Sequence, residues 1–343
     1  MIERDKLAEL LARTGSLTIG LLGDLFLDRY LEIAPELTER SIETGLEAYQ
    51  IARVRNVAGA LGTVMNNLAA LGVGKIVPVS VIGDDGHGYD LMGAVRNLPS
   101  VDTRFILQSE QRATPTYIKP IQPESNGTWR ELNRLDVRSR EPLPEHVSVR
   151  LGNMLAEVFS RVDGLIVLDQ VEETNCGVVN EQSRTMLEQL AISAPSKLVF
   201  VDSRAHIRDF RCGILKGNLA ELTTATGVDP QADNAAERAA TALARQTRQP
   251  VYCTLGERGI LVAQSDGTAV IVPTTPVSGP IDIVGAGDSA TSAIVVSLLA
   301  GASHTEAAAV ANLVASITVQ QIGTTGTASP DQVLQRWDEV HCV

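Results

Sequence analysis

From residue 146 onward, the sequence alternates between helical and strand-like segments. Residues 147–162 have helical periodicity and residues 164–168 form an apolar, strand-like run, and the same order recurs in residues 180–192 and 198–201. When a helix joins two neighbouring strands of one sheet, the strands run parallel and the crossover is right-handed. The alternation therefore predicts an α/β fold with a doubly wound, mostly parallel sheet.

The composition fits a large core and argues against some kinds of partner. The chain has 343 residues, of which 44% are hydrophobic, and this length allows either two domains or one large α/β domain. Asp plus Glu outnumber Lys plus Arg by 41 to 29, and the formal charge of −12 argues against nucleic acid or an anionic membrane as a partner. We expect one domain over residues 1–343 that binds small molecules.

No segment predicts export or insertion into a membrane. Residues 1–13 are charged and amphipathic and lack the apolar centre of a signal peptide, and no run of about 18 apolar residues occurs. The cysteines lack the spacing of a zinc site or a CxxC motif, which is typical of reduced thiols. They are Cys176, Cys212, Cys253 and Cys342. These patterns predict a cytoplasmic protein.

A glycine-rich turn leads into a segment that reads as a buried helix. Residues 281–289 (Ile-Asp-Ile-Val-Gly-Ala-Gly-Asp-Ser) precede residues 290–300, which are apolar or small at most positions. The amino end of a helix carries unpaired N–H groups and partial positive charge, which suit an anion. Gly285 and Gly287 would let a phosphate approach the backbone, and Asp288 beside it could accept a hydroxyl proton. The residues also fit an ordinary glycine-rich turn with an N-capping Asp.

The run D-x-x-G-A-G-D from Asp282 to Asp288 resembles the second signature of the ribokinase-like (PfkB) carbohydrate kinases. This resemblance implies a ribokinase-like, three-layer α/β fold with a small β lid, made from inserts near residues 30–57 and 100–137. It also implies ATP-dependent phosphorylation of a hydroxyl on a sugar or sugar phosphate. Mg²⁺ would be the cofactor, together with a monovalent cation such as K⁺.

The same resemblance assigns roles within the glycine-rich turn. Asp288 would be the catalytic base, and the N–H groups of Gly285, Ala286 and Gly287 would stabilise the charge on the transferred phosphoryl group. Asp282 would help a monovalent cation to order the turn. Phosphoryl transfer needs positioning and charge stabilisation more than a strong base, so an Asp of ordinary basicity is sufficient.

Carboxylates follow two strand-like runs of the predicted sheet. Residues 23–30 (Gly-Asp-Leu-Phe-Leu-Asp-Arg-Tyr) place Asp24 and Asp28 just after the first run, and Asp169 follows another. Ligands bind at the carboxyl ends of strands in open α/β sheets, although the spacing of Asp24 and Asp28 also fits solvated loop acids. Residues 23–30 are similar to the start of the heptose-7-phosphate kinase domains of ADP-heptose synthesis in this family. This similarity implies that Asp28 holds sugar hydroxyls, and Asp24 and Asp169 are further candidates for substrate contact.

A second glycine-containing turn precedes the helical pattern that begins at Leu61. Gly59, Ala60 and Thr63 occupy the positions where the first signature of the family has two glycines and a sugar-binding Asn. The hydroxyl of Thr makes fewer hydrogen bonds than the amide of Asn. The segment also fits a plain core helix. The resemblance places these three residues at the substrate, but the two departures leave the identity of the sugar open.

Asn218 and Glu221 open an apolar run with the spacing N-x-x-E. This spacing fits a capping box at the start of a helix. It also resembles the N-x-x-E of the family, which tunes magnesium and phosphate through water, and both roles are compatible. Magnesium prefers oxygen ligands and keeps much of its water.

Two further features resemble nucleotide contacts of the family. Thr254, Gly256 and Gly259 match its T-x-G-x-x-G loop, although a hairpin would leave the same pattern. Asn312 lies in an alanine-rich helical segment and would approach the adenine. A packed core amide explains Asn312 equally well.

Two other functions fit this sequence. One is a nucleoside kinase with the same fold, and the other is a non-catalytic sugar-sensing protein, which Ala60 and Thr63 favour. The intact Gly-Ala-Gly-Asp run counts against a sensor, because a sensor needs no proton acceptor beside an anion site. A homodimer formed through the lid is a further expectation from the resemblance.

Overall fold

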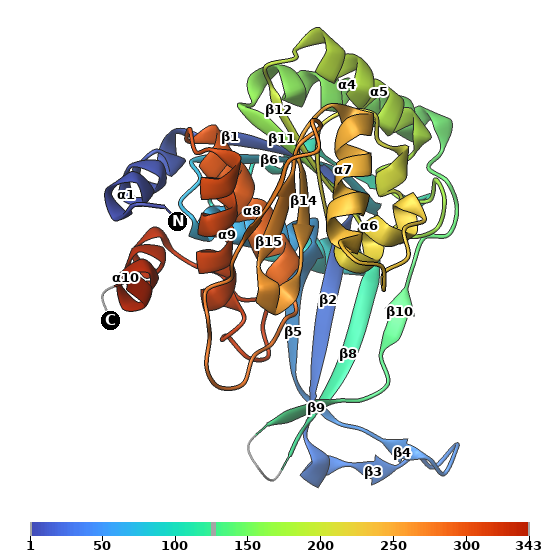
Figure 1. The fold of residues 1–343 in the computed structure, drawn as a ribbon. Coiled ribbons are helices and arrows are strands. Elements are labelled where there is room, and N and C mark those ends of the chain that lie inside the picture. The colour runs from blue at the N-terminus through green and yellow to red at the C-terminus, as the bar shows by residue number, and fades with distance from the viewer. Residues whose placement is uncertain (1, 125–127, 342–343) are drawn as a thin grey trace.

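The computed structural model describes residues 2–124 and 128–341 (Figure 1). In this part of the chain a 9-stranded sheet forms the centre of the fold. Its strands in spatial order are β16 (Ala269–Val272), β15 (Ile260–Ala263), β14 (Val251–Thr254), β13 (Ile214–Asn218), β12 (Leu198–Ser203), β11 (Gly164–Asp169), β1 (Thr18–Gly23), β6 (Lys75–Gly83) and β7 (Ile106–Ser109). The pairs from β14 to β7 are parallel, and β15 and β16 are antiparallel additions at one end. The predicted mostly parallel sheet is confirmed.

Helices cover both faces of this sheet because its buried strands are apolar on both sides. In β11, Ile166 and Leu168 belong to one apolar core, whereas Leu165 and Val167 belong to the other. The first core is closed by α1 (Arg4–Ala12), α2 (Leu61–Ala70), α3 (Gly86–Arg96), α8 (Ala286–Leu299), α9 (His304–Thr318) and α10 (Pro330–His341). The second is closed by α4 (Glu145–Arg161), α5 (Glu181–Ser193), α6 (Leu219–Thr226) and α7 (Ala235–Thr247). The predicted three-layer arrangement is therefore confirmed.

A smaller sheet projects from the large one and forms the predicted lid (Figure 1). Its strands, in spatial order, are β10 (Leu135–Val137), β8 (Thr116–Pro123), β2 (Leu25–Ile33) and β5 (Ile51–Ala60), with β9 (Trp129–Glu131) paired to β8. A separate hairpin of β3 (Glu39–Arg40) and β4 (Glu47–Ala48) lies at the far end. Because a single residue separates the end of β1 from the start of β2, the lid is attached at the carboxyl end of β1.

The lid differs in extent from the predicted inserts, 30–57 and 100–137. β2 already begins at Leu25 and β5 continues to Ala60, so the first part of the lid extends beyond the predicted bounds on both sides. The strand at 106–109 belongs to the large sheet, so the second part of the lid begins only at Thr116. Pairing between strands far apart in sequence, which local patterns do not reveal, sets these boundaries. Within the described residues, no helix is long and apolar enough to span a membrane.

Candidate active site

The glycine-rich turn forms the amino end of α8, as predicted. Gly285 precedes the helix with a φ of 80°, a left-handed conformation that glycine adopts without strain. The first helical hydrogen bond runs from the Ser289 N–H to the Gly285 carbonyl at 2.9 Å. The N–H groups of Gly287 and Asp288 precede this bond and have no partner inside the helix. They are available to an anion.

One part of the predicted anion site is arranged differently. The N–H of Ala286 donates to the carbonyl of Ile283 at 3.1 Å, so this group is already paired. The free donors are therefore those of Gly287 and Asp288, shifted by one residue from the predicted set. The turn before the helix satisfies the earlier donor, a contact that sequence spacing alone does not specify.

Asp288 lies in the first turn of α8 among charged groups. Burial raises the pKa of Asp288 to about 7, and the negative charge of Asp202 adds to this shift. The positive charges of Lys216 and Arg204 oppose it. A carboxylate that titrates near neutral pH is well suited to accept a proton from a hydroxyl.

A buried ion pair between two strands of the large sheet supports the start of α8. Lys216, on β13, donates to Asp202 at 2.6 Å and to the Gly287 carbonyl at 3.2 Å. Thr291 of α8 donates to the same Asp202 oxygen at 2.7 Å. Burial alone would lower the pKa of Lys216, but the charge and hydrogen bond of Asp202 raise it. Sequence analysis missed Lys216, although a lysine within an apolar strand just before N-x-x-E was an available signal.

Asp282 connects the glycine-rich turn to the segment after α9. Its two carboxylate oxygens accept the N–H groups of Val284 at 3.0 Å and Gly323 at 3.1 Å. Its own N–H donates to the Val319 carbonyl at 2.7 Å. These contacts fix the turn through protein groups, and the monovalent-cation role of Asp282 stays a prediction.

Asp28 lies on the lid strand β2, between β5 and β8. Lys119 Nζ is 3.2 Å from Asp28 Oδ1 and 3.4 Å from the Tyr30 hydroxyl. A Cβ atom on Gly59 would lie 2.8 Å from Asp28 Oδ2, so glycine is needed beside this carboxylate. The Asp28 side chain remains 14% exposed. It can therefore still meet a ligand.

The turn from Gly59 to Thr63 connects the two sides of the site. Gly59 adjoins Asp28, while the Thr63 methyl group lies 3.5 Å from the position of a Cβ on Gly285. Between them, Ala60 has a φ of 51° and a ψ of −113°, in the half of conformational space that glycine prefers. Thr63 is almost completely buried. The turn therefore links Asp28 to α8, but the Thr63 side chain offers little open surface.

Asp24 and Asp169 are both buried, unlike the open substrate contacts predicted for them. Asp24 Oδ1 accepts from Arg112 at 2.8 Å and from the Val178 N–H at 3.0 Å. Asp169 Oδ2 accepts from the Ser203 hydroxyl at 2.8 Å. Burial raises the pKa of Asp169 to about 7; the Ser203 hydrogen bond opposes this shift and the charge of Asp24 adds to it. Through these hydrogen bonds both carboxylates fix neighbouring loops, so we propose no direct substrate contact for either.

Asn218 and Glu221 form a capping box at the start of α6, one of the two predicted interpretations. The Asn218 side chain accepts the Glu221 N–H at 2.9 Å, and Glu221 Oε2 accepts the Asn218 N–H at 2.7 Å. Burial raises the pKa of Glu221, while the hydrogen bond from Asn218 opposes the rise. The cap fixes the position of Glu221 and leaves its Oε1 outside this bond.

The predicted nucleotide residues are divided between the loop after β14 and the helix α9. Thr254 ends β14, and Gly256 and Gly259 flank a turn with φ values of 59° and 96°. A Cβ on Gly259 would lie 2.1 Å from the Val272 carbonyl oxygen, so this position requires glycine. Asn312 of α9 donates to the carbonyl oxygens of Val272 and of the next residue, both at 3.0 Å. In this structure Asn312 acts as a packed amide.

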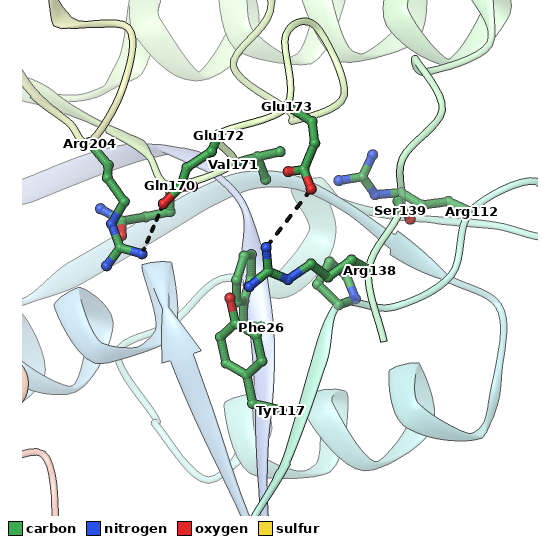
Figure 2. Close-up of a pocket in the computed structure, with 11 residues that line it drawn as sticks. Phe26, Arg112, Tyr117, Arg138, Ser139, Gln170, Val171, Glu172, Glu173 and Arg204 are labelled. Carbon is green, nitrogen blue, oxygen red and sulfur yellow. Dashed lines mark ion pairs between the residues drawn. The ribbon is translucent and has the colours of Figure 1, made fainter. Parts of the chain in front are cut away.

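A pocket lies between the lid and the loops that follow β11 and β12 (Figure 2). Phe26 and Tyr117 line it from the lid strands, and charged side chains line its other walls. These are Arg112, Arg138, Glu172, Glu173 and Arg204. Phe26 lies two residues before Asp28, so both side chains leave β2 on the same face. The pocket therefore opens on the same face of the lid as Asp28, although Asp28 does not line it, and sequence analysis missed Arg138 and Arg204 as lining residues.

Comparison with known proteins agrees with this geometry. The model of the pfkB family of carbohydrate kinases matches residues 30–332. The bifunctional protein HldE of Caulobacter sp. (strain K31) is 31% identical over 328 residues, which cover 93% of this chain and 63% of that protein. The chain thus spans slightly less than two thirds of the length of that relative.

Two solved structures show the same fold. Ribokinase of Arabidopsis thaliana, complexed with ribose and ATP, has a TM-score of 0.69 and 17% identity, covering 93% of this chain and 98% of that chain. Phosphofructokinase-2 of Escherichia coli, in complex with fructose-6-phosphate, has a TM-score of 0.68 and 17% identity, covering 94% and 99%. At this identity the two structures establish the ribokinase-like fold. Together with the family match over most of the chain, they lead to one conclusion: this chain belongs to the pfkB family of carbohydrate kinases.

Proposed function

We propose that this chain transfers the γ-phosphoryl group of ATP to a hydroxyl of a sugar or sugar phosphate, with Asp288 as the base. The observation that carries the proposal is the position of Asp288 in the first turn of α8, next to unpaired N–H groups and with its pKa raised to about 7. Proton acceptor and anion donors thus belong to one rigid element.

In the proposed step, the oxygen of the acceptor hydroxyl attacks the γ-phosphorus and the bond to the β–γ bridging oxygen breaks. The hydroxyl proton moves to Asp288. The N–H groups of Gly287 and Asp288 donate to the oxygens of the transferred group, where charge is spread in the transition state. The Lys216–Asp202 pair fixes the Gly287 carbonyl and so orients this turn.

A magnesium ion fits beside Glu221 if the nucleotide supplies most of its ligands. Across residues 2–124 and 128–341, no group of three or more His, Cys, Asp or Glu side chains could hold a metal ion. Magnesium commonly binds through one or two carboxylates, water and substrate phosphates. Glu221 would hold such an ion through water, with Asn218 fixing the carboxylate. When bound, the ion neutralises charge on the phosphates; K⁺ near Asp282 would have a structural role.

On the acceptor side, Asp28 is placed to hold sugar hydroxyls. Lys119 orients this carboxylate, and Gly59 leaves room beside it. The similarity of residues 23–30 to heptose-7-phosphate kinase domains favours a heptose-phosphate-like acceptor. Ala60 and Thr63 reshape the neighbouring turn relative to the family signature, so the acceptor is best identified by direct screening.

A panel of sugars, sugar phosphates and nucleosides, assayed for ATP consumption with magnesium, tests the proposal. Asp288→Asn should bind nucleotide normally and lose at least about 100-fold in kcat on the best acceptor. Asp266→Asn, in an exposed turn, is the matched control and should retain kcat. Near-normal turnover by Asp288→Asn would exclude it as the base. Adenosine or inosine as the best acceptor would indicate a nucleoside kinase, and sugar binding without turnover would indicate a sensor.

We also propose that two copies pair through their lids. Several large apolar side chains of the lid are exposed, including Leu46, Val54 and Leu135, and such surfaces often mark contacts between proteins. Val54→Asp should shift a dimer towards monomer in analytical ultracentrifugation. Ile192→Asp, at an exposed apolar position on α5, is the control. A monomeric wild-type chain would refute the pairing.

A further inference from the structure

Arg204 lines the pocket that we assign to the acceptor, and it lies two residues after Asp202, whose carboxylate accepts hydrogen bonds from Lys216 and from Thr291 of α8. It follows the carboxyl end of β12, and its N–H donates to the Asp169 carbonyl at 3.0 Å, which fixes the backbone. Its side chain lines the pocket between the lid and the loop after β11 (Figure 2). The positive charge of Arg204 also lowers the pKa of Asp288 and the pKa of Glu221. Arg204 thus lines this pocket, and its charge acts on both the proposed base and the proposed magnesium contact.

The guanidinium group of Arg204 is only weakly held. It forms an ion pair with Glu172, in which Nη1 of Arg204 lies 3.8 Å from Oε1 of Glu172. The side chain of Arg204 is 53% exposed and that of Glu172 is 60% exposed. Exposed pairs of this kind contribute little to stability. An arginine held this loosely can exchange its carboxylate for a more highly charged phosphate at little cost.

Lys216, the other cation near Asp288, cannot exchange its partners as easily. Lys216 is buried and is committed to Asp202 at 2.6 Å and to the Gly287 carbonyl at 3.2 Å. Removing a partner from a buried pair of this type is strongly destabilising. Lys216 therefore supports the turn, and its charge is largely neutralised by Asp202.

We propose that Arg204 is a further catalytic residue, which leaves Glu172 and binds the transferring phosphoryl group. This inference rests on the proposed kinase function. While the acceptor oxygen bonds to the γ-phosphorus, ADP departs and the proton passes to Asp288, Arg204 remains protonated and donates hydrogen bonds to the phosphoryl oxygens. Its planar, two-pronged guanidinium matches phosphate geometry. The unpaired N–H groups of Gly287 and Asp288 would bind the group from the helix side.

Steady-state kinetics on the best acceptor of the panel test this assignment. Arg204→Ala should lower kcat by at least about 100-fold, in the range found when a transition-state donor or arginine is removed. The KM for the acceptor and the Kd for a nucleotide analogue should change by less than about threefold, since ground-state binding is largely kept. Arg208→Ala, at a nearby exposed position outside the pocket, is the control and should retain kcat. An intact kcat with a raised acceptor KM would overturn the proposal, because Arg204 would then only bind the acceptor.

The pH profile of kcat/KM distinguishes direct contact of Arg204 with the phosphoryl group from a purely structural role. Asp288 is faced by Asp202, Lys216 and Arg204, and removal of Arg204 takes away one charge that lowers its pKa. The midpoint of the pH profile of kcat/KM should therefore move upward in Arg204→Lys less than in Arg204→Ala. Added guanidinium should restore part of the kcat lost by Arg204→Ala. An unchanged midpoint and no rescue would refute contact with the reacting group, and if the Ala variant does not fold, the Lys variant still reports kcat. A wild-type chain inactive with the whole panel would refute the proposed function itself.

Discussion

Arg112 and Asp24 form an ion pair in which the two side chains are only 2% and 0% exposed. Arg112 Nη2 lies 2.8 Å from Asp24 Oδ1, and its Nη1 donates to the Cys176 carbonyl at 3.2 Å. The pair therefore joins the end of β1, the segment before β8 and the loop that leads to α5. Arg112 also lines the pocket between the lid and the loop after β11, so this buried pair helps to fix one wall of that pocket.

Arg112→Ala should lower the free energy of unfolding by about 3–5 kcal/mol, because it leaves the Asp24 carboxylate buried without its cation. Urea denaturation measures this change. Arg161→Ala removes an exposed pair with Glu157 on α4 and should cost less than about 1 kcal/mol. Equal losses in the free energy of unfolding of the two variants would show that the buried pair stabilises the fold no more than the exposed pair does.

The buried Asp169 makes stability depend on pH. Its pKa is about 7 in the folded chain, against 3.8 for an ordinary Asp, so the folded state binds more protons between these values. The free energy of unfolding should fall as the pH rises from about 4 to 7, because in this range only the unfolded state releases the proton. Asp288 contributes with the same sign.

Asp169→Asn removes one of these two contributions. Between pH 5 and 8, the variant should lose less stability than the wild type, by up to about 3 kcal/mol at about 1.4 kcal/mol per pKa unit. Urea titrations across this range measure the difference. Asp266→Asn should leave the slope unchanged, because hydrogen bonds from Thr268 lower the pKa of Asp266, away from this range. Parallel slopes for wild type and Asp169→Asn would contradict the prediction.

Local pattern identified the parts of the site that local chemistry determines. The turn at Gly285 requires a left-handed residue, and the helix after it is apolar or small at most positions, so both were predictable. Arg112 and Lys216 were not, because their importance depends on partners 88 and 14 residues away in the chain. For the same reason, an Asp that follows a strand looks alike in the sequence whether it faces a ligand or, like Asp24, a buried arginine.

Lys119 orients Asp28 from the neighbouring lid strand. Lys119→Met removes the charge that holds this carboxylate at 3.2 Å and should raise the KM of the acceptor by about 10-fold, the effect of losing about 1.4 kcal/mol of binding. Nucleotide affinity should not change, since α8 and α6 are untouched. Lys75→Met, which removes a pair with Asp102 at the opposite end of β6, is the control for general loss of charge. A higher Kd for nucleotide without a change in acceptor KM would show that Lys119 and Asp28 act on the nucleotide and not on the acceptor.

Ala60 holds a backbone conformation that suits glycine, with a φ of 51° between Gly59 and α2. A residue with a Cβ pays about 1–2 kcal/mol in the left-handed half of conformational space. Glycine would relieve this strain, but it adds freedom to the unfolded chain that offsets about 0.4–1 kcal/mol. Ala60→Gly should therefore stabilise the fold by up to about 1 kcal/mol, measured by urea denaturation.

Ala52→Gly supplies the matched comparison, because Ala52 lies on the same strand with no positive φ and is exposed. That change should destabilise the fold by about 0.5–1 kcal/mol, as glycine does inside a strand. Opposite signs in the two variants would locate strain at Ala60, on the turn between Asp28 and α8. Because the turn links the acceptor side to the helix that carries Asp288, relief of strain should also alter the acceptor KM in Ala60→Gly and not in Ala52→Gly. If both variants are destabilised alike, Ala60 is not strained and the alanine reflects packing of its methyl group.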